Sequence, residues 1–330
     1  EYDSALRGQA GIKVYEEMRR NEPTIAIGLR AIKWVLGQVN WTVRSGGTTP
    51  VDEDAATYLD SCIKDMSVPW QRVVRDALTC LDFGWAYAEV VYKQRAGPDA
   101  DPPSLYDDGR LGWRKLTLVS QTSLDRWDID EHGGIQGLWQ NASTMGMNTS
   151  IYVPITKALL FRIDDERNNA EGVSLLRSAY RPWYSKKNLE EVEAIGIERD
   201  LTGVLTITPP TGASAQDKTT ALDLLEQFRR DDMTGFFLPR NGPGPDQRWE
   251  VNIINSPGSK AIEPNIVILR YQGEIARTFL TQFLLLGQTA TGSWALGRDQ
   301  RDMFELALGA ILGSIADVVN RFLVPSLFRL

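Results

Sequence analysis

Histidine and cysteine are scarce in this sequence. The 330 residues include one histidine, His132, and two cysteines, Cys62 and Cys80. Metal sites built on two or three histidines are therefore excluded, and the cysteines form no C-x-x-C pair that could bind zinc. His132 lies in Asp-Glu-His-Gly-Gly, a pattern typical of an exposed tight turn between strands. We expect no metal, no cofactor and a reducing compartment.

An excess of positive charge is also absent. The chain has 36 Lys and Arg against 43 Asp and Glu, a net charge of −7 and a pI near 5.0. A tight DNA binder is usually basic, so that class is disfavoured. A surface past which DNA slides is compatible with this charge, because strong phosphate contacts would retard the DNA.

Signatures of catalysis are missing too. The GxxxxGK[ST] sequence that binds ATP does not occur, so this chain is not expected to be a motor. Paired acids can support hydrolysis, and an enzyme would have to use Asp164, Asp165 and Glu166, or Asp231 and Asp232. Neither group has a supporting motif, and we expect that the chain is not an enzyme.

A signal peptide and a long apolar run are not visible. The stretch from Leu306 to Val319 is interrupted by Ser314 and Asp317 and falls short of a membrane span. The sequence begins in an amphipathic pattern, so we expect the natural chain to continue upstream. With 42% hydrophobic and 24% charged residues, the composition predicts a globular chain of two or three modules.

The first half of the chain combines helical and strand patterns. Spacing predicts a helix–turn–helix over 1–43, with Pro23 starting the second helix, and further helices over 52–66 and 70–83, the last stopping at Gly84. A strand is expected at 85–92. Gly/Pro/Asp clusters at 97–103 and 107–112 then separate short strand patterns, a meander packed on helices. These patterns cover 116–119, 126–129, 135–139, 151–153 and 159–163.

Long helices dominate the second half. A helix is expected over 174–199, with Ser174 as its N-cap and Pro182 either kinking it or marking its true start. The sequence then predicts a small α/β insert with strands at 204–207, 235–238 and 249–254 and a helix at 217–230. Two more helices follow, at 263–286 and at 298–323, the last stopping near Pro325.

Four stretches of sequence within this succession of elements resemble those of a known protein family. They are GVSLLRSAYRPWYSKK at 172–187, QGEIAR at 272–277, LGQT at 286–289 and ALTCLDFGWAYAEVVYK at 77–93. Together they resemble the portal proteins of Mu-type bacteriophages, over most of the chain from 52 to 323. No single stretch is as specific as a zinc-finger spacing, whereas the ordered set is.

The resemblance implies an α+β portal fold with named regions. These are an α/β wing at 1–171, a first stem helix at 172–201, a small α/β clip at 202–258, a second stem helix at 259–286, a tunnel loop at 287–297 and a long helix under the wing at 298–330. A crown would follow Leu330.

The same resemblance implies a function in the virion. Portal proteins form a ring, typically of twelve copies, at one capsid vertex, and double-stranded DNA passes through it during packaging and ejection. The implied partners are further copies of the chain, the terminase large subunit, a head–tail adaptor and the major capsid protein, with no membrane. The implied location is the virion, and the host cytoplasm during assembly. The alternative is another head-completion or minor head protein, although adaptors are usually much shorter.

The segment 287–297 contains no charged residue. In a ring it would present hydroxyls, an amide and an indole to DNA, and such weak, interchangeable contacts suit low friction. The alternative is a plain loop between two helices. The candidate channel residues are Gln288, Thr289, Thr291, Ser293 and Trp294.

Two helices carry candidate charged positions. Arg270 and Arg277 are seven residues apart and share one helix face, where they would touch phosphate in the channel or pair with a neighbouring residue. On the first stem helix, basic residues precede acids, which opposes the helix dipole and suggests pairing between adjacent copies. The alternative is i,i+4 pairs on a solvated face. The candidates there are Arg181, Lys186, Lys187, Glu190 and Glu191, and the expected packing positions of the second stem helix include Ile266, Leu269, Ile275 and Phe279.

Overall fold

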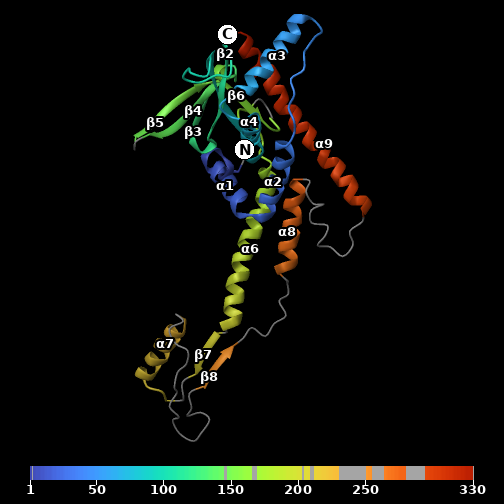
Figure 1. The fold of residues 1–330 in the computed structure, drawn as a ribbon. Helices are drawn as coiled ribbons and strands as arrows, with labels where there is room; N and C mark the ends of the chain where they lie inside the picture. The colour runs from blue at the N-terminus through green and yellow to red at the C-terminus, as the bar shows by residue number, and fades with distance from the viewer. Residues whose placement is uncertain are drawn as a thin grey trace. The chain divides into compact units, whose positions relative to one another are not determined.

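A computed structural model of the chain describes most of its residues. These are residues 1, 3–144, 147–165, 169–202, 204–208, 212–229, 250–254, 264–279 and 294–329. They fall into two units, the first comprising Glu1–Tyr184 with Arg270–Leu330 and the second Ser185–Leu269. The first unit begins with a run of helices, continues with a run of strands in antiparallel sheets, and ends in helices (Figure 1), which confirms the predicted α+β class.

Local capping signals set the N-terminal helices of the first unit. α1 (Gly8–Asn21) and α2 (Pro23–Gly37) confirm the predicted helix–turn–helix, although a 3-10 turn, Ser4–Leu6, comes first. The Glu22 side chain caps α2 by accepting a 3.2 Å hydrogen bond from the Thr24 amide. α3 (Pro50–Lys64) starts two residues earlier than expected, because Thr49 and Asp52 form a reciprocal capping box.

The helix predicted over 70–83 is interrupted. α4 (Trp70–Ala77) ends before Thr79, whose hydroxyl donates to the Asp76 carbonyl at 2.7 Å, and α5 (Cys80–Phe83) follows. A threonine hydroxyl that bonds to the backbone competes with helix propagation. Gly84 ends α5 with φ of 87°, and a Cβ there would lie 2.3 Å from the Gly172 carbonyl oxygen. Only glycine suits this position.

The strands of the first unit form two three-stranded antiparallel sheets and not one meander. β1 (Trp85–Ala96) lies between β2 (Asp107–Val119) and β6 (Ala158–Arg162). The second sheet has the order β3 (Leu124–Ile129), β4 (Ile135–Thr144), β5 (Met147–Pro154). The Gly/Asp cluster at 107–112 lies inside β2, because β1 continues beyond Tyr92 and pairs with it, Gln94 opposite Leu111.

Aromatic contacts join the two sheets. Trp127 of β3 meets Trp85 of β1 edge to face, with ring centroids 5.0 Å apart, and also contacts Tyr87. The Tyr87 hydroxyl donates to the Val153 carbonyl of β5 at 2.9 Å. Trp85 and Tyr87 are completely buried, together with Trp113 of β2. The core of the first unit therefore lies between its sheets and helices.

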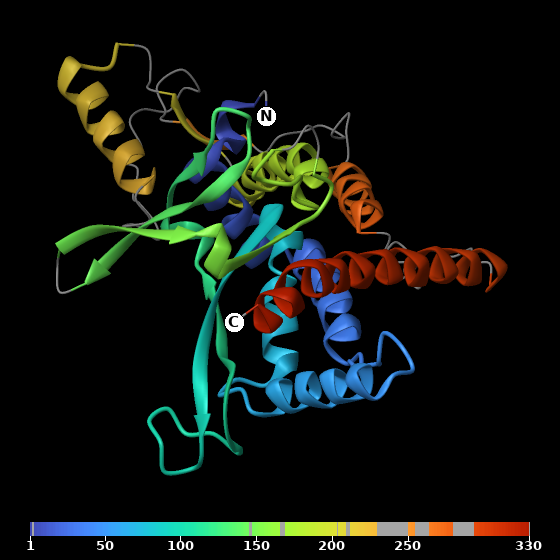
Figure 2. The same cartoon turned by 90° about the horizontal axis from the view of Figure 1, so that it is seen from above.

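The C-terminal helix continues further than predicted. α9 (Trp294–Val318) begins four residues before the expected 298 and leads through a π-helical turn, Val319–Leu323, into α10 (Val324–Phe328). The chain therefore does not leave the helix near Pro325. A proline lacks the N–H of a regular helix, and the wider turn just before it accommodates this loss. α9 lies beside α2 and β6 (Figure 2).

This segment is more apolar than the sequence alone suggested. The helix Asp302–Phe328 is long and apolar enough to cross a membrane by length and composition alone, and its most apolar 18 residues have a mean hydropathy of 1.6. The expectation that the stretch from Leu306 to Val319 falls short was wrong on length and composition, because the helix continues on both sides of that stretch. Phe304, Leu308 and Ile315 are buried in the core, yet only 17% of the most apolar 18 residues are buried.

The second unit contains the predicted small α/β insert. β7 (Val204–Thr208) pairs with β8 (Glu250–Ile254) in antiparallel register, and α7 (Ala215–Arg229) contacts β7. The strand expected at 235–238 lies outside the described residues. Two helices belong to both units, α6 (Leu176–Thr202) and α8 (Pro264–Thr278).

The start of α6 is fixed by its cap. The Ser174 hydroxyl accepts a 3.0 Å hydrogen bond from the Leu176 amide and donates to the Asp82 carbonyl at 2.5 Å. Pro182 lies inside α6, so it does not mark the start of the helix.

Candidate functional site

The charged residues of α6 pair along the helix. Lys186 is buried, and its Nζ lies 3.1 Å from Glu190 Oε1, an i,i+4 pair. Arg181, Lys187 and Glu191 are exposed. The alternative of i,i+4 pairing therefore holds for Lys186 and Glu190, and pairing between copies stays a prediction.

α8 presents its arginines away from the core. Ile275 and Phe279 are buried, as predicted, whereas Arg270 and Arg277 are exposed. The Arg270 guanidinium lies 4.9 Å from the ring centroid of Tyr271 and 3.8 Å from Glu274 Oε1. Arg270 thus has a partner on its own helix, and its exposed position leaves it accessible to other molecules.

Most candidate tunnel-loop residues, namely Gln288, Thr289, Thr291 and Ser293, lie outside the described residues. Trp294 is the first residue of α9. The last four residues of the predicted loop, 294–297, are therefore helical, because α9 extends further toward the N-terminus than the apolar pattern indicated.

The second unit exposes large apolar side chains on both helices that it shares with the first. Val192 on α6 and Ile266 on α8 are each 64% exposed, and Ile195, Ile197 and Leu269 are also exposed. Ile266 and Leu269 were expected to be packing positions, and within the subunit they are not. The only apolar side chains buried among those described in this unit are Ala221 and Ile268. Such apolar surface usually marks a contact with another molecule.

A buried ionic network around Asp65 was not predicted. The Lys93 Nζ lies 3.1 Å from the Asp65 carboxylate, and the side chains are 3% and 2% exposed. The carboxylate also accepts 2.7 Å hydrogen bonds from the Ser104 hydroxyl and the Leu105 amide. Burial alone would raise the pKa of Asp65, but these hydrogen bonds and Lys93 lower it below its usual value. The one signal in the sequence is a lysine inside an apolar strand.

A second buried carboxylate joins α1, α2 and α5. Asp82 is fully buried and accepts hydrogen bonds from Lys33 at 2.6 Å and Arg19 at 3.1 Å. Its Oδ1 atom has no hydrogen-bond partner among the described residues. Burial raises the pKa of Asp82, against the opposing effect of Lys33 and Arg19. This arrangement stabilises the packing of the three helices.

The residues considered for catalysis do not come together in the described part of the chain. His132 is exposed in the predicted turn, where its amide donates to the Asp130 carboxylate at 2.9 Å. Asp164 and Asp165 are exposed, while Glu166, Asp231 and Asp232 lie outside the described residues. No group of three or more His, Cys, Asp or Glu side chains that could hold a metal occurs among the residues described.

Several solved structures of gene transfer agent (GTA) particles contain a chain with a similar fold. A chain of the "Virion of native gene transfer agent (GTA) particle" matches with a TM-score of 0.58 and 11% identity, over 96% of this chain and 82% of that one. A chain of the "Neck of native GTA particle computed with C12 symmetry" matches with a TM-score of 0.58 and 11% sequence identity, over 94% of this chain and 81% of that one. A chain of the "Neck of empty GTA particle computed with C6 symmetry" matches with a TM-score of 0.56 and 13% sequence identity, over 94% of this chain and 82% of that one. These matches show a shared fold.

Nearly the whole sequence also fits one family model. The model described as "Portal protein of Mu bacteriophage" matches residues 12–330, which include the second unit, most of the first unit, and every helix and strand from α2 onward. The match confirms the resemblance carried by the four sequence stretches. The chain belongs to the Mu-type family of bacteriophage portal proteins.

Proposed function

We propose that this chain forms a ring, of twelve copies, at one vertex of a phage capsid, and that double-stranded DNA passes through it during packaging and ejection. Family membership supports this function, and so does the fold shared with a particle neck computed with C12 symmetry. The observation that carries the proposal is the apolar surface exposed on α6 and α8 in the second unit.

The exposed residues suit contacts between neighbouring copies. Val192 and Ile266 are each 64% exposed, and complete burial of such a side chain contributes about 1.5–3 kcal/mol. In a ring every α6 and α8 would face the corresponding helices of two neighbours, so each copy would bury these side chains. The exposed charges of α6, among them Arg181, Lys187 and Glu191, would pair around the rim of the same contact.

The regions of the chain receive the following roles. The wing is 1–171, the stem helices are 172–201 and 259–286, and the clip is 202–258. Because α9 begins at Trp294, the tunnel loop shortens to 287–293 and the helix under the wing becomes 294–330. The clip would bind the terminase large subunit during packaging and a head–tail adaptor afterwards, and the wing would contact the major capsid protein. The terminase would supply ATP hydrolysis, so the portal subunit acts as a structural protein of the virion, assembled in the host cytoplasm.

The channel surface is proposed to be nearly neutral. Gln288, Thr289, Thr291, Ser293 and Trp294 would offer DNA contacts that exchange easily, since none carries a fixed charge. Arg270 and Arg277 would touch phosphates in passing.

The oligomeric state tests the ring. Negative-stain microscopy and mass photometry of the purified chain should show rings with a central hole, and a monomer for the wild-type chain would overturn the proposal. Val192→Asp combined with Ile266→Asp should abolish the rings, because it places charges in the apolar contact. Leu105→Asp is the matched control, since Leu105 is 73% exposed on a loop of the first unit. A charge reversal at Lys187 should weaken assembly, and unchanged assembly would refute the role of that residue.

DNA transport tests the channel separately. Thr289→Lys with Thr291→Lys would add two cations per copy to the tunnel loop, and we expect slower translocation in a packaging reaction with terminase and ATP. The control is Thr57→Lys, an exposed position on α3 and outside the clip that would bind terminase. An unchanged rate in assembled rings would refute the assignment of the loop to the channel and leave the ring intact.

A further inference from the structure

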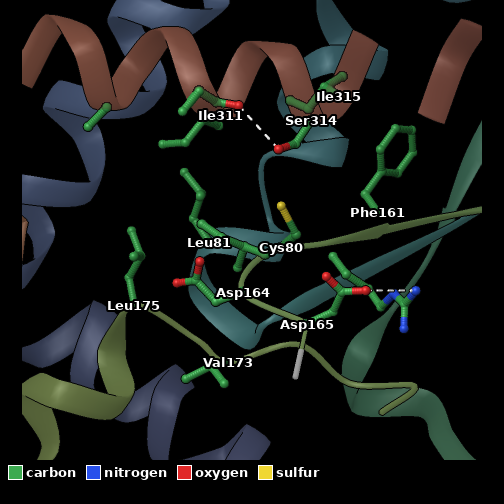
Figure 3. A pocket seen from close by; sticks show the side chains of 14 residues that line it. Cys80, Leu81, Phe161, Asp164, Asp165, Val173, Leu175, Ile311, Ser314 and Ile315 are labelled. Atoms are coloured by element: carbon green, nitrogen blue, oxygen red, sulfur yellow. Dashed lines mark hydrogen bonds and ion pairs between the residues drawn. The ribbon is translucent and has the colours of Figure 1, made fainter. Parts of the chain in front are cut away.

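A groove runs beside α9 in the first unit. One wall is α9 from Ala307 to Ile315, and the other consists of α5, the end of β6 and the segment before α6 (Figure 3). Its volume is about 760 Å³, and apolar side chains such as Leu81, Val173 and Ile311 line much of it. The α9 wall spans nine residues, or eight helical steps, which is about 12 Å of helix. The groove could therefore seat about two turns of another helix.

The groove carries an acid that has no ion-pair partner among the described residues. Asp164 is exposed and lines the groove, and it has no ion-pair partner among the described residues. Its φ of 47° lies in the left-handed region, which costs energy for a residue other than glycine. Asp165 pairs with Arg162 at 3.0 Å. One arginine and two aspartates line the groove, which gives it a net charge of −1.

A complementary surface lies on α2. Ile27 and Trp34 are 56% and 68% exposed, and Arg30 lies between them on the face opposite the buried residues of the helix. Arg30 borders a cavity of about 330 Å³. The other three cations of this cavity pair with Glu16 or Asp82, whereas Arg30 has no ion-pair partner among the described residues and leaves this surface positive. The distance from Ile27 to Trp34 is two helical turns, about 10.5 Å, which matches the length of the groove. We define Ile27, Arg30 and Trp34 as the α2 face.

We propose that the α2 face of one copy seats in the α9 groove of the next copy, with Arg30 pairing with Asp164. The two surfaces agree in length, in apolar character and in the sign of their charge, and both belong to the same unit. A contact between two different surfaces of identical chains is head-to-tail, and such contacts close into a ring when the rotation permits it. The inference rests on the proposed ring and adds a specific contact to it.

Charge reversal in a reciprocal pair tests the contact. Arg30→Asp and Asp164→Arg should each raise the subunit concentration needed for half-maximal ring assembly by about tenfold or more, because each places two like charges together. The double variant carries both changes on every copy, restores an opposite pair at each contact, and should recover most of the assembly. Arg44→Asp and Glu131→Arg are the matched controls, as exposed residues outside both surfaces.

Additional variants separate electrostatics from folding. Asp164→Asn keeps the shape of the side chain, and asparagine tolerates the left-handed backbone conformation of this position. It should weaken assembly less than Asp164→Arg does, because it removes the negative charge without reversing it. Ala310→Trp would fill the groove, and Trp34→Ala would remove the apolar anchor, so both should impair assembly while the circular dichroism spectrum of the subunit stays unchanged. If the wild-type chain forms rings and both reversals assemble as the controls do, this contact is wrong and the ring stands. If the wild-type chain forms no ring, the proposed function itself fails.

Discussion

Replacement of Asp65 by alanine should lower the free energy of unfolding of the first unit by about 3–5 kcal/mol. The carboxylate is 2% exposed, and its partner Lys93 is 3% exposed. Without Asp65, the lysine would keep its charge in a buried site, and the Leu105 amide would lose its acceptor. A buried donor without a partner costs about 1–3 kcal/mol.

The backbone limits this loss. Lys93 also donates to the carbonyl oxygens of Asp65 and Pro103, both at 2.7 Å, and these acceptors remain in the alanine variant. The ammonium group therefore keeps these two hydrogen bonds, so the loss in the free energy of unfolding should not exceed about 5 kcal/mol. Because domains unfold with about 5–15 kcal/mol, the effect should be large in any equilibrium measurement.

Urea denaturation followed by tryptophan fluorescence measures this change, and a double-mutant cycle isolates the ion pair. Lys93→Met should also be destabilising, since it leaves the Asp65 carboxylate buried without its cation. The double variant Asp65→Ala with Lys93→Met should lose less than the sum of the single losses, by at least about 1 kcal/mol. A loss below about 1 kcal/mol for Asp65→Ala, or strict additivity in the cycle, would refute the reasoning.

Three further outcomes concern the same unit. Gly84→Ala should lower the free energy of unfolding in urea by at least about 2 kcal/mol, because φ is 87° and the new methyl group would meet the Gly172 carbonyl. Gly133→Ala is the control and should lower it less, because Gly133 lies in an open turn with φ of 81°. Tyr87→Phe should cost about 1 kcal/mol through the lost hydrogen bond between the sheets, and no change in the unfolding midpoint would contradict this. Since the pKa of Asp65 is lowered on folding, its stabilisation is complete above a pH of about 4 and declines below it, so wild-type and Asp65→Ala stabilities should converge in acid.

Local signals in the sequence predicted the helices of the first unit well. Pro23 and Ser174 mark helix starts because a rigid ring or a capping hydroxyl acts within one turn of the residue that carries it. Thr79 shows the limit of this approach. Its hydroxyl bonds to a carbonyl three residues earlier and interrupts a helix that apolar spacing alone would continue.

The sequence patterns could not predict contacts between residues that are far apart along the chain. β1 pairs with β6 across more than sixty residues, Trp85 opposite Arg162, and no periodicity specifies which strand becomes a neighbour. The pairing of Asp65 with Lys93 is hidden for the same reason. A lysine in an apolar strand can turn outward or find an internal anion, and only the folded chain shows which occurs.

The candidate site was predictable in position more than in detail. The helical phase placed Arg270 and Arg277 on one exposed face of α8, where the structure has them. The phase could not show that Ile266 on the same helix is exposed, since an apolar residue in a helix pattern is equally suited to a core and to a contact between subunits. Trp294 was assigned to a loop because the small polar residues before it have no helical period, yet α9 begins there.

The two units differ in how much apolar surface each buries, and this difference bears on assembly. In the first unit a continuous core includes Trp85, Trp113 and Met18, so this unit has its own source of stability. In the second unit the described apolar side chains are buried only at Ala221 and Ile268, while Val192 and Ile266 face outward. Anything that covers these side chains in the folded state stabilises that state by mass action. The stability of the second unit should therefore depend on subunit concentration more steeply than that of the first, which has its own core. Substitutions on the exposed apolar face of the second unit should change ring assembly before they change the unfolding of that core.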